Sequence, residues 1–368
     1  MGVNMRVLIL GGYGNFGKII AQRLSSIASV ELVIAGRNID KAKLFASKIN
    51  ADAMLLDAKQ KNIASTLKEQ KIDVLISTAG PFQGQDYYVA ESAIAAGCHY
   101  IDLADGKAFV CGITQLNELA KNVGVLVCSG ASSVPGLSSA VVNEFLPRFS
   151  VLKKVMIGIS TSEKAPGRAT INSLFDYCGK PIDQLIDGHW VKRYGWQKLV
   201  YHKFTEPLGY RPLAACDIPD LTLFPRQYKT LETVSFSAGT GLKLTHYGTW
   251  FFSWLIRLGI IRKPQRYSRW MHKAASLVEF FGDGRSGMHV TLSGLDHEAK
   301  PLQLCWELIA LNNDGVNIPC LASVALVRKM MTGCFSSVGA MSSMGLLTLD
   351  EYLEELKGLT FTTHLKEL

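Results

Sequence analysis

The chain has 368 residues, which is long enough for two domains with sizeable cores. Hydrophobic residues make up 48% of it and charged residues 19%, a balance typical of soluble globular proteins. The formal net charge is +8, but Lys and Arg are interspersed with Asp and Glu. This argues against a nucleic-acid partner, which would require a clustered basic patch. The charge is compatible with an anionic small-molecule ligand and equally with a merely basic surface.

The cysteine and histidine patterns argue against a disulfide framework and against a metal site. None of the eight cysteines forms a CxxC pair, and several lie in apolar runs such as "GVLVCSG" and "LQLCWELIAL". We therefore expect reduced, buried thiols in a cytoplasmic protein without a signal peptide. The histidines form neither HxH nor HExxH, and G-x-S-x-G is absent, so we expect neither a metal ion nor a serine hydrolase.

The first strand is predicted at residues 6–10, an apolar run typical of a strand buried in a parallel sheet. Gly12, Gly14 and Gly17 follow in a G-x-G-x-x-G pattern, and residues 18–24 continue as a helix. Glycines at these positions allow a tight turn, leave space for a pyrophosphate and let the helix pack closely on the strand. The free N–H groups at the helix end would bind the phosphates, so the stretch predicts dinucleotide binding. A glycine turn without a ligand is the alternative.

The end of the second predicted strand, residues 30–38, indicates which dinucleotide is bound. NAD sites usually carry Asp or Glu there, which binds the ribose 2′-hydroxyl. This chain has Gly36 and then Arg37, whose guanidinium could bind a 2′-phosphate, so we expect NADP, with NAD as the second possibility. Arg37 could instead be a solvated residue that opens the next helix. Asp57, after the third strand, could lie near the adenine or cap a helix.

Strands and helices continue to alternate through the first third of the chain. Further strands are predicted at residues 72–78 and 99–105 and in "VLVCSGA", separated by helices. This pattern predicts a doubly wound parallel sheet, a Rossmann fold, that ends near Ala131. The small residues of "AGPFQGQ" follow the strand at 72–78 and mark the carboxyl edge, where a ligand would lie.

Eight motifs follow one another along nearly the whole chain. They are GGYGNFG, AGPF, YIDLADG, GASSVPGLSS, GRATINSL, GMHVTLSGLD, GVNIPCLASVALVRKM and GLLTLDEYLEEL. As a set they resemble the saccharopine dehydrogenase or saccharopine reductase-like oxidoreductases. The resemblance implies an amino-terminal NAD(P)-binding Rossmann domain, a second α/β domain and a C-terminal segment that packs back on the first. It does not make saccharopine the substrate, because many members of this broad family have no assigned substrate.

The second half of the chain predicts an α+β domain with a mixed or antiparallel sheet and helices. Residues 231–239 and 287–296 alternate like antiparallel strands, and "LQLCWELIALNN" is expected to pair with the second of them. We therefore divide the chain into a Rossmann domain at 1–135, a substrate or dimerisation domain at 136–340, and a C-terminal segment at 341–368.

Hydride transfer requires a group that handles one proton near the nicotinamide. Lys107 is the attractive proton donor, and the alternative is a surface lysine that opens the next helix. Asp102 is a second candidate, which could instead be buried and bonded to the backbone. Arg168, between a glycine and a helix, could bind a substrate carboxylate or simply begin the helix.

The predicted site is completed by Ser132, which could bind the carboxamide of the cofactor or serve only the turn in "ASSVPG". The predicted catalytic residues are Lys107, Asp102 and Arg168. The predicted cofactor-binding residues are Gly12, Gly14, Asn15, Phe16, Gly17, Arg37, Asn38, Asp57, Ala79, Gly80, Pro81 and Ser132.

An aromatic helical insertion is predicted near residues 245–282, with basic residues among its tryptophans. Its apolar helix, residues 245–261, spans fewer than the roughly 20 residues that a bilayer requires. The insertion could be a lid on the second domain or a broad apolar substrate pocket. It could also contact lipid through residues 245–270, or a second subunit in a homodimer.

Three functions are compatible with these patterns. The first is an NADP-dependent oxidoreductase that transfers hydride to or from a small molecule with a C=N, C=O or C=C bond. The second is saccharopine chemistry, the reversible reduction of an imine that joins lysine to a dicarboxylic acid. It would require several cations for the three carboxylates of saccharopine. The third is a non-catalytic dinucleotide-binding protein attached to a membrane or a partner.

Overall fold

The computed structural model describes residues 4–161, 168–278, 282–333 and 335–368. The chain forms two compact units. Unit 1 comprises residues 1–140 and 317–355, and unit 2 comprises residues 141–316 and 356–368. The chain therefore runs from unit 1 into unit 2, returns to unit 1 and ends in unit 2.

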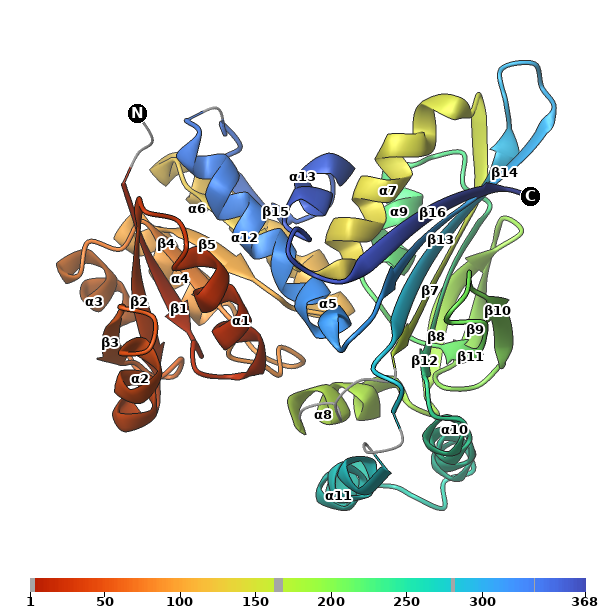
Figure 1. Cartoon of the computed structure of the whole chain (residues 1–368), viewed down its shortest axis with the longest axis horizontal. Helices are drawn as coiled ribbons and strands as arrows, with labels where there is room; N and C mark the ends of the chain where they lie inside the picture. The colour runs from red at the N-terminus through yellow and green to blue at the C-terminus, as the bar shows by residue number, and fades with distance from the viewer. Residues whose placement is uncertain (1–3, 162–167, 279–281, 334) are drawn as a thin grey trace. The chain divides into compact units, whose positions relative to one another are not determined.

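Unit 1 is built on a parallel sheet whose described strands have the order β15-β6-β5-β4-β1-β2-β3 (Figure 1). The order reverses between β1 and β4, which is the position where doubly wound sheets bind ligands at the carboxyl ends of their strands. The predicted fold class is thus confirmed. The strands are β1 (Met5–Leu10), β2 (Val30–Gly36), β3 (Asp52–Leu55), β4 (Val74–Ser77), β5 (His99–Asp102), β6 (Leu126–Ser129) and β15 (Gly339–Ser342).

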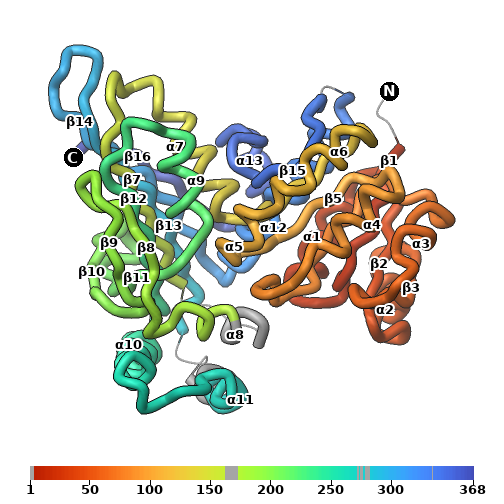
Figure 2. The backbone as a smooth tube through the Cα atoms, turned by 180° about the vertical axis from the view of Figure 1, so that it is seen from behind, coloured from red at the N-terminus to blue at the C-terminus, as the bar shows by residue number. Residues whose placement is uncertain are grey.

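Helices cover both faces of this sheet (Figures 1 and 2). Helix α1 packs against α12 on one face, while α3, α4 and α6 form a row on the other. Helix α12 is buried nearly all round, which explains its continuous apolar sequence. The helices are α1 (Asn15–Leu24), α2 (Ile39–Ala46), α3 (Ile63–Glu69), α4 (Tyr88–Ala96), α5 (Lys107–Gly112), α6 (Asn117–Val123), α12 (Ile318–Met331) and α13 (Leu349–Glu354).

The observed units differ from the predicted division at residues 135 and 340. The chain returns to unit 1 at Asn317, because α12 covers the first sheet and β15 extends it by pairing with β6. Of the predicted C-terminal segment, residues 341–355 lie in unit 1 and residues 356–368 lie in unit 2. The latter include β16 (Phe361–Glu367), which pairs with a strand of the second sheet.

Unit 2 is built on a mixed sheet with the main strand order β10-β11-β12-β7-β13-β14-β16, in which β12 and β7 are parallel. The predicted hairpin is present: β13 and β14 pair antiparallel from Ser286–Ala310 to Leu295–Pro301. Four strands between residues 181 and 215 were not predicted. The side chains of β9 and β10 are exposed or half-buried and give no regular apolar pattern, whereas β11 is buried except for Tyr210. The strands are β7 (Val151–Thr161), β8 (Pro181–Ile186), β9 (His189–Tyr194), β10 (Val200–Lys203), β11 (Tyr210–Ala215), β12 (Thr233–Thr240), β13 (Ser286–Leu295) and β14 (Pro301–Ala310).

The helices of unit 2 include the predicted aromatic insertion, which forms α10 and α11. No helix in the described residues has both the length and the apolar character needed to cross a bilayer. The seven cysteines in the described ranges are free thiols, and all but Cys111 are buried. The helices are α7 (Ser138–Phe145), α8 (Arg168–Tyr177), α9 (Asp220–Gln227), α10 (Lys243–Arg257) and α11 (Ser268–Val278).

A buried carboxylate, Glu307, joins three strands of unit 2. It lies on β14 and accepts hydrogen bonds from His202 Nε2 on β10 at 2.8 Å and from Lys366 Nζ on β16 at 2.9 Å. The backbone N–H and the hydroxyl of Thr205 complete its partners. Burial by itself would raise the pKa of Glu307, but these hydrogen bonds outweigh it and hold the pKa well below its ordinary value. The ionised form therefore stabilises the sheet.

We expect Glu307→Gln to lower the free energy of unfolding by about 3 kcal/mol at neutral pH, because Lys366 and His202 lose their anionic partner. The loss should shrink as the pH falls below 4.5, the ordinary pKa of this group, since the wild-type stabilisation requires ionisation. Urea denaturation measures both effects. The matched control is Glu298→Gln in the exposed pair with Lys300, for which we expect a change within about 0.5 kcal/mol. Equal changes in the two variants would contradict the assignment.

Candidate functional site

The turn after β1 brings the backbone of α1 directly onto the strand end. Gly11 has a φ of +84°, and Gly12 N donates to the carbonyl oxygen of Ile9 at 3.1 Å. A Cβ at Gly17 would overlap the carbonyl oxygen of Gly11, so only glycine allows this helix to pack so close. Gly14 is exposed and would meet only that same oxygen, at 3.1 Å. The turn therefore leaves Gly14 exposed beside the N–H groups at the start of α1, which have no partner within the helix.

Tyr13, which the sequence analysis missed, ties this turn to the end of β2. Its hydroxyl accepts a hydrogen bond from Asn38 N at 2.9 Å, and its ring fills the space where Gly36 has no side chain. Asn38 is also the N-cap of α2, since its side chain accepts from Lys41 N at 2.9 Å. Arg37 is exposed between them. The end of β2 thus presents a cation and no carboxylate.

The loop after β4 contains the predicted residues Ala79, Gly80 and Pro81. Thr78 fixes its beginning, because both its N–H and its hydroxyl donate to the carbonyl oxygen of Leu10 at the end of β1. Gln85 fixes the rest by donating from Nε2 to the carbonyl oxygens of Ala79 and Pro81. The loop therefore lies beside the glycine turn, with Gly80 and Pro81 exposed.

Asp102 is a fully buried carboxylate at the end of β5 that joins two loops. Its Oδ1 accepts from Ala104 N and Gly130 N, each at 2.9 Å, and from Ser129 Oγ at 3.0 Å. Oδ2 has no hydrogen-bond partner among the described residues. Burial raises the pKa of Asp102 to about 6, although these hydrogen bonds lower it in part. This geometry favours the backbone-bonded role over the catalytic one.

The remaining candidates around β5 and β6 lie on the same edge of the sheet. Lys107 is half-buried and begins α5, next to Asp105, which accepts from Gln83 Nε2 at 2.9 Å. Ser132 is held through its backbone, because its carbonyl oxygen accepts from the hydroxyl of Tyr352 at 2.7 Å. Tyr352 comes from the returning segment, which sequence reasoning did not connect to the site.

Three contacts therefore join the four loops in the order of their strands: Thr78 to Leu10, Gln83 to Asp105, and Asp102 to Gly130. Two predicted residues take no part in these three contacts. Asp57 caps a local turn by accepting from Lys59 N, and the helix that follows has Asn62 as its N-cap. The side chain of Arg168, at the start of α8 in unit 2, lies outside the described residues.

A second group of polar side chains, in unit 2, brings possible metal ligands within 4.8 Å of one another: His202, His289 and Cys305. The two imidazoles stack at 3.7 Å with an interplanar angle of 6°. Their lone pairs lie in parallel planes and cannot converge on one ion. This arrangement supports a packed polar cluster beside Glu307.

Asp102 makes the stability of the fold depend on pH. Its folded pKa of about 6 exceeds the ordinary value of 3.8, so the folded chain holds the proton more tightly than the unfolded chain. The resulting stabilisation is complete below pH 3.8 and is lost as the pH rises to about 6, a change of about 3 kcal/mol. We expect Asp102→Asn to escape this loss, so that the variant gains about 3 kcal/mol relative to the wild type between about pH 4 and pH 7.

Urea denaturation along a pH series measures this difference. The control is Asp40→Asn, which removes an exposed carboxylate from α2. Parallel profiles for Asp102→Asn and the wild type would show that Asp102 does not titrate in this range.

The comparisons with known proteins agree with this geometry. Residues 7–128 match the family model described as the saccharopine dehydrogenase NADP binding domain. No curated protein matches the chain. The chain is similar in structure to apo histidine-tagged saccharopine dehydrogenase (L-Glu forming) from Saccharomyces cerevisiae, with a TM-score of 0.70, 13% identity, and coverage of 98% of this chain and 100% of that one.

Biliverdin reductase in complex with biliverdin and NADP+ from Synechocystis sp. matches over 96% of both chains at 14% identity, but its TM-score of 0.44 is too low to support an argument. The likeness to the yeast enzyme, at 13% identity, shows a shared fold. The resemblance inferred from the motifs is confirmed. Residues 7–128 thus match the saccharopine dehydrogenase NADP binding domain, and the chain has the same fold as the yeast enzyme.

Proposed function

We propose that the protein is an NADP-dependent oxidoreductase that transfers hydride between the nicotinamide ring and a small molecule with a C=N, C=O or C=C bond. The observation that carries the proposal is the glycine turn, with Gly14 exposed beside the start of α1, next to a β2 end that carries Arg37. The cofactor would supply the hydride. The protein would bind and orient both molecules and move one proton.

The end of β2 supports NADP over NAD. A carboxylate that binds the ribose 2′-hydroxyl would repel a 2′-phosphate, and here Gly36 offers no side chain because Tyr13 occupies that space. Arg37 is exposed and forms no ion pair with a described residue. Its planar guanidinium can donate two parallel hydrogen bonds to one phosphate group. The nearest acid in sequence, Asp40, lies in the first turn of α2.

Lys107 is the residue we propose as proton donor. It follows β5 at the carboxyl edge, where the loops after β1, β4, β5 and β6 meet, and it is half-buried. Its ammonium would give a proton to the nitrogen or oxygen of the substrate as hydride adds to carbon. Asp102 is a positioning residue in this scheme, because it holds the loops after β5 and β6.

True saccharopine chemistry is the second candidate, since the family model and the yeast structure carry that name. It would require several free cations near the substrate. Arg211 of unit 2 does not supply one, because it is buried, with its Nη2 on Asp283 at 2.6 Å and its Nη1 on the carbonyl oxygen of Gly241. An unidentified substrate is therefore the better-supported proposal.

Calorimetric titration with NADPH, NADH and their oxidised forms tests the cofactor. We expect tighter binding of NADPH, and we expect Arg37→Asp to weaken NADPH at least about tenfold while NADH changes little, since only the 2′-phosphate interacts with the guanidinium. The matched control is Lys68→Asp at the end of α3, on the opposite edge of the sheet. Equal weakening of both dinucleotides would contradict a 2′-phosphate contact.

The reaction is tested by NADPH absorbance with panels of carbonyl compounds, enones and amine plus 2-oxo-acid pairs. On any active substrate we expect Lys107→Gln to lower kcat about 100-fold and leave the Kd for NADPH unchanged, since a proton donor acts only in the chemical step. Lys121→Gln on α6 is the control. An unchanged kcat in Lys107→Gln would mean that another group donates the proton. NADPH binding without turnover of any compound in the panels would favour the non-catalytic alternative.

A further inference from the structure

Helix α10 presents an unusual surface, with polar side chains turned inward and apolar side chains turned outward. His246, Thr249 and Ser253 are buried against unit 2. Burial lowers the pKa of His246 to about 4, so the neutral ring faces the interior. Helices on the surface of a globular protein normally show the reverse arrangement.

The outward face of α10 is a continuous apolar stripe. Leu244, Tyr247, Phe251 and Leu258 are spaced by three, four and seven residues, which puts them on one side of the helix. Leu244 is 75% exposed, Phe251 60% and Leu258 67%. Ile260 follows in the connecting segment and is also exposed. An exposed apolar stripe of this kind indicates a contact surface.

Helix α11 adds a second apolar pair with cations beside it. Trp270 is 77% exposed and Leu277 79%, and their spacing of seven residues places them on one face. Arg269 and Lys273 are exposed next to them. Figures 1 and 2 place α10 and α11 at the same end of unit 2.

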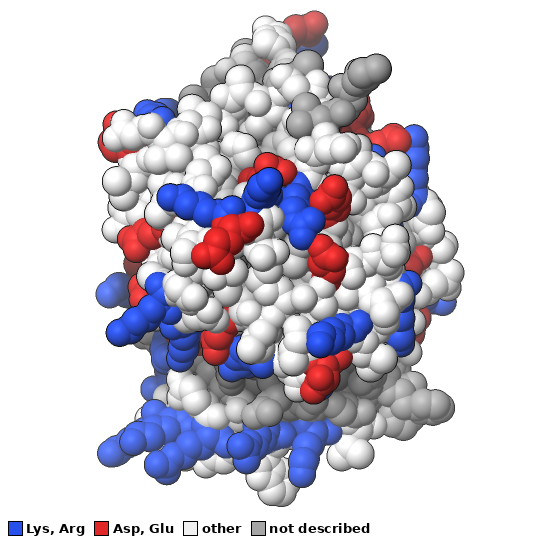
Figure 3. Space-filling model, turned by 90° about the vertical axis from the view of Figure 1, so that its left-hand side faces the viewer, with Lys and Arg blue, Asp and Glu red and all other residues white. Residues whose placement is uncertain are grey.

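The charge of this segment has a single sign. Residues 240–278 contain seven Lys and Arg and no Asp or Glu. None of the seven pairs with an acid in the described residues. Figure 3 shows Lys and Arg gathered in a band along its lower edge, where Figure 1 places α11, with no Asp or Glu among them. Elsewhere in the sequence, basic residues are interspersed with acidic ones.

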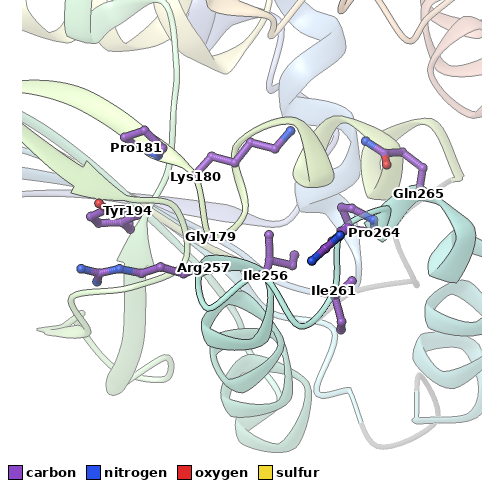
Figure 4. Close-up of a pocket in the computed structure, with 11 residues that line it drawn as sticks. Gly179, Lys180, Pro181, Tyr194, Ile256, Arg257, Ile261, Pro264 and Gln265 are labelled. Atoms are coloured by element: carbon purple, nitrogen blue, oxygen red, sulfur yellow. The ribbon is translucent and has the colours of Figure 1, made fainter.

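A pocket of about 510 Å³ lies beside the end of α10, between the segment 179–181 and the segment 256–265 (Figure 4). Lys180, Arg257 and Arg262 line it, and none of its lining residues is acidic. Arg257 is held in place, because its guanidinium stacks on Tyr194 at 3.7 Å and donates to Gln197 at 2.7 Å. The pocket therefore presents fixed positive charge next to the exposed Leu258 and Ile260.

We propose that α10 and α11 form a peripheral docking surface for a bilayer with anionic phospholipids. The apolar residues of the stripe would enter the headgroup region, the surrounding cations would contact lipid phosphates, and the pocket at the end of α10 would take one headgroup phosphate. A second copy of the chain fits less well, because two such surfaces would bring cations of like sign together with no acid to offset them.

The test is flotation of the full-length protein with vesicles of phosphatidylcholine alone or mixed with phosphatidylglycerol. We expect the partition coefficient to be at least about tenfold higher on the anionic vesicles and to fall with added salt. Two sets of exposed residues are changed: Leu244→Gln with Phe251→Gln, and Arg262→Gln with Arg269→Gln and Lys273→Gln. The apolar set should weaken binding to both vesicle types, and the cationic set should weaken only the anionic preference, each about tenfold.

The controls are Leu44→Gln, which removes a 65%-exposed leucine from α2 of unit 1, and Lys68→Gln on α3. Both should bind vesicles as the wild type does. Equal binding to neutral and anionic vesicles, or no effect of either set, would overturn the proposal. A second result would also overturn it: the wild type forms a dimer in sedimentation velocity and does not bind vesicles, and the apolar set of substitutions dissociates the dimer. The surface would then bind a second copy of the chain. Thermal unfolding midpoints within error of the wild type confirm that each variant is folded.

Discussion

The close approach of the first turn of α1 to the end of β1 is the constraint on which unit 1 depends. The carbonyl oxygen of Gly11 occupies the space that a Cβ at Gly17 would need, so the helix can lie there only because that position has no side chain. The same packing aims the N–H groups at the start of α1 over Gly14. It also places Tyr13 across the end of β2 and lets Thr78 bond to Leu10. One backbone contact therefore sets the position of three loops.

Asp102 joins the loops after β5 and β6, which lie beyond the position between β1 and β4 where the strand order reverses. A buried carboxylate with a raised pKa is often a sign of catalysis. Here its hydrogen bonds go to Ala104, Ser129 and Gly130, which are the residues that turn the chain after β5 and β6. The returning segment reinforces these turns from outside, because Ser343 donates to Gly130 O at 2.6 Å and Tyr352 donates to Ser132 O. The carboxyl edge of this sheet is thus held by polar contacts between segments far apart in sequence.

Unit 2 has two contrasting groups of charged residues: buried ones that are paired inside the unit, and exposed ones among residues 240–278. Glu307 and Arg211 are satisfied inside the unit by partners on neighbouring elements. The cations of residues 240–278, by contrast, lie without acidic partners beside exposed apolar side chains. The net charge of +8 is therefore unevenly distributed. The amino-acid composition of the whole chain suggested a surface with evenly mixed charges. Composition does not show on which side of α10 each residue lies.

The sequence by itself determined the Rossmann fold of the first third, because glycine spacing, apolar strands and amphipathic helices are local patterns that one segment can carry. It also determined the β13–β14 hairpin and the family resemblance, since a set of motifs along one chain is specific. The resemblance implied a C-terminal segment that returns to the first domain. The tertiary structure alone decided that the return begins with α12 and β15 and that β16 pairs with β14, because strand pairing across many residues leaves no local signal. It alone decided that Asp102 ties two loops and that Tyr13 fills the space above Gly36. Those roles depend on which distant backbone groups come within hydrogen-bonding or packing distance, and only the folded chain brings them together.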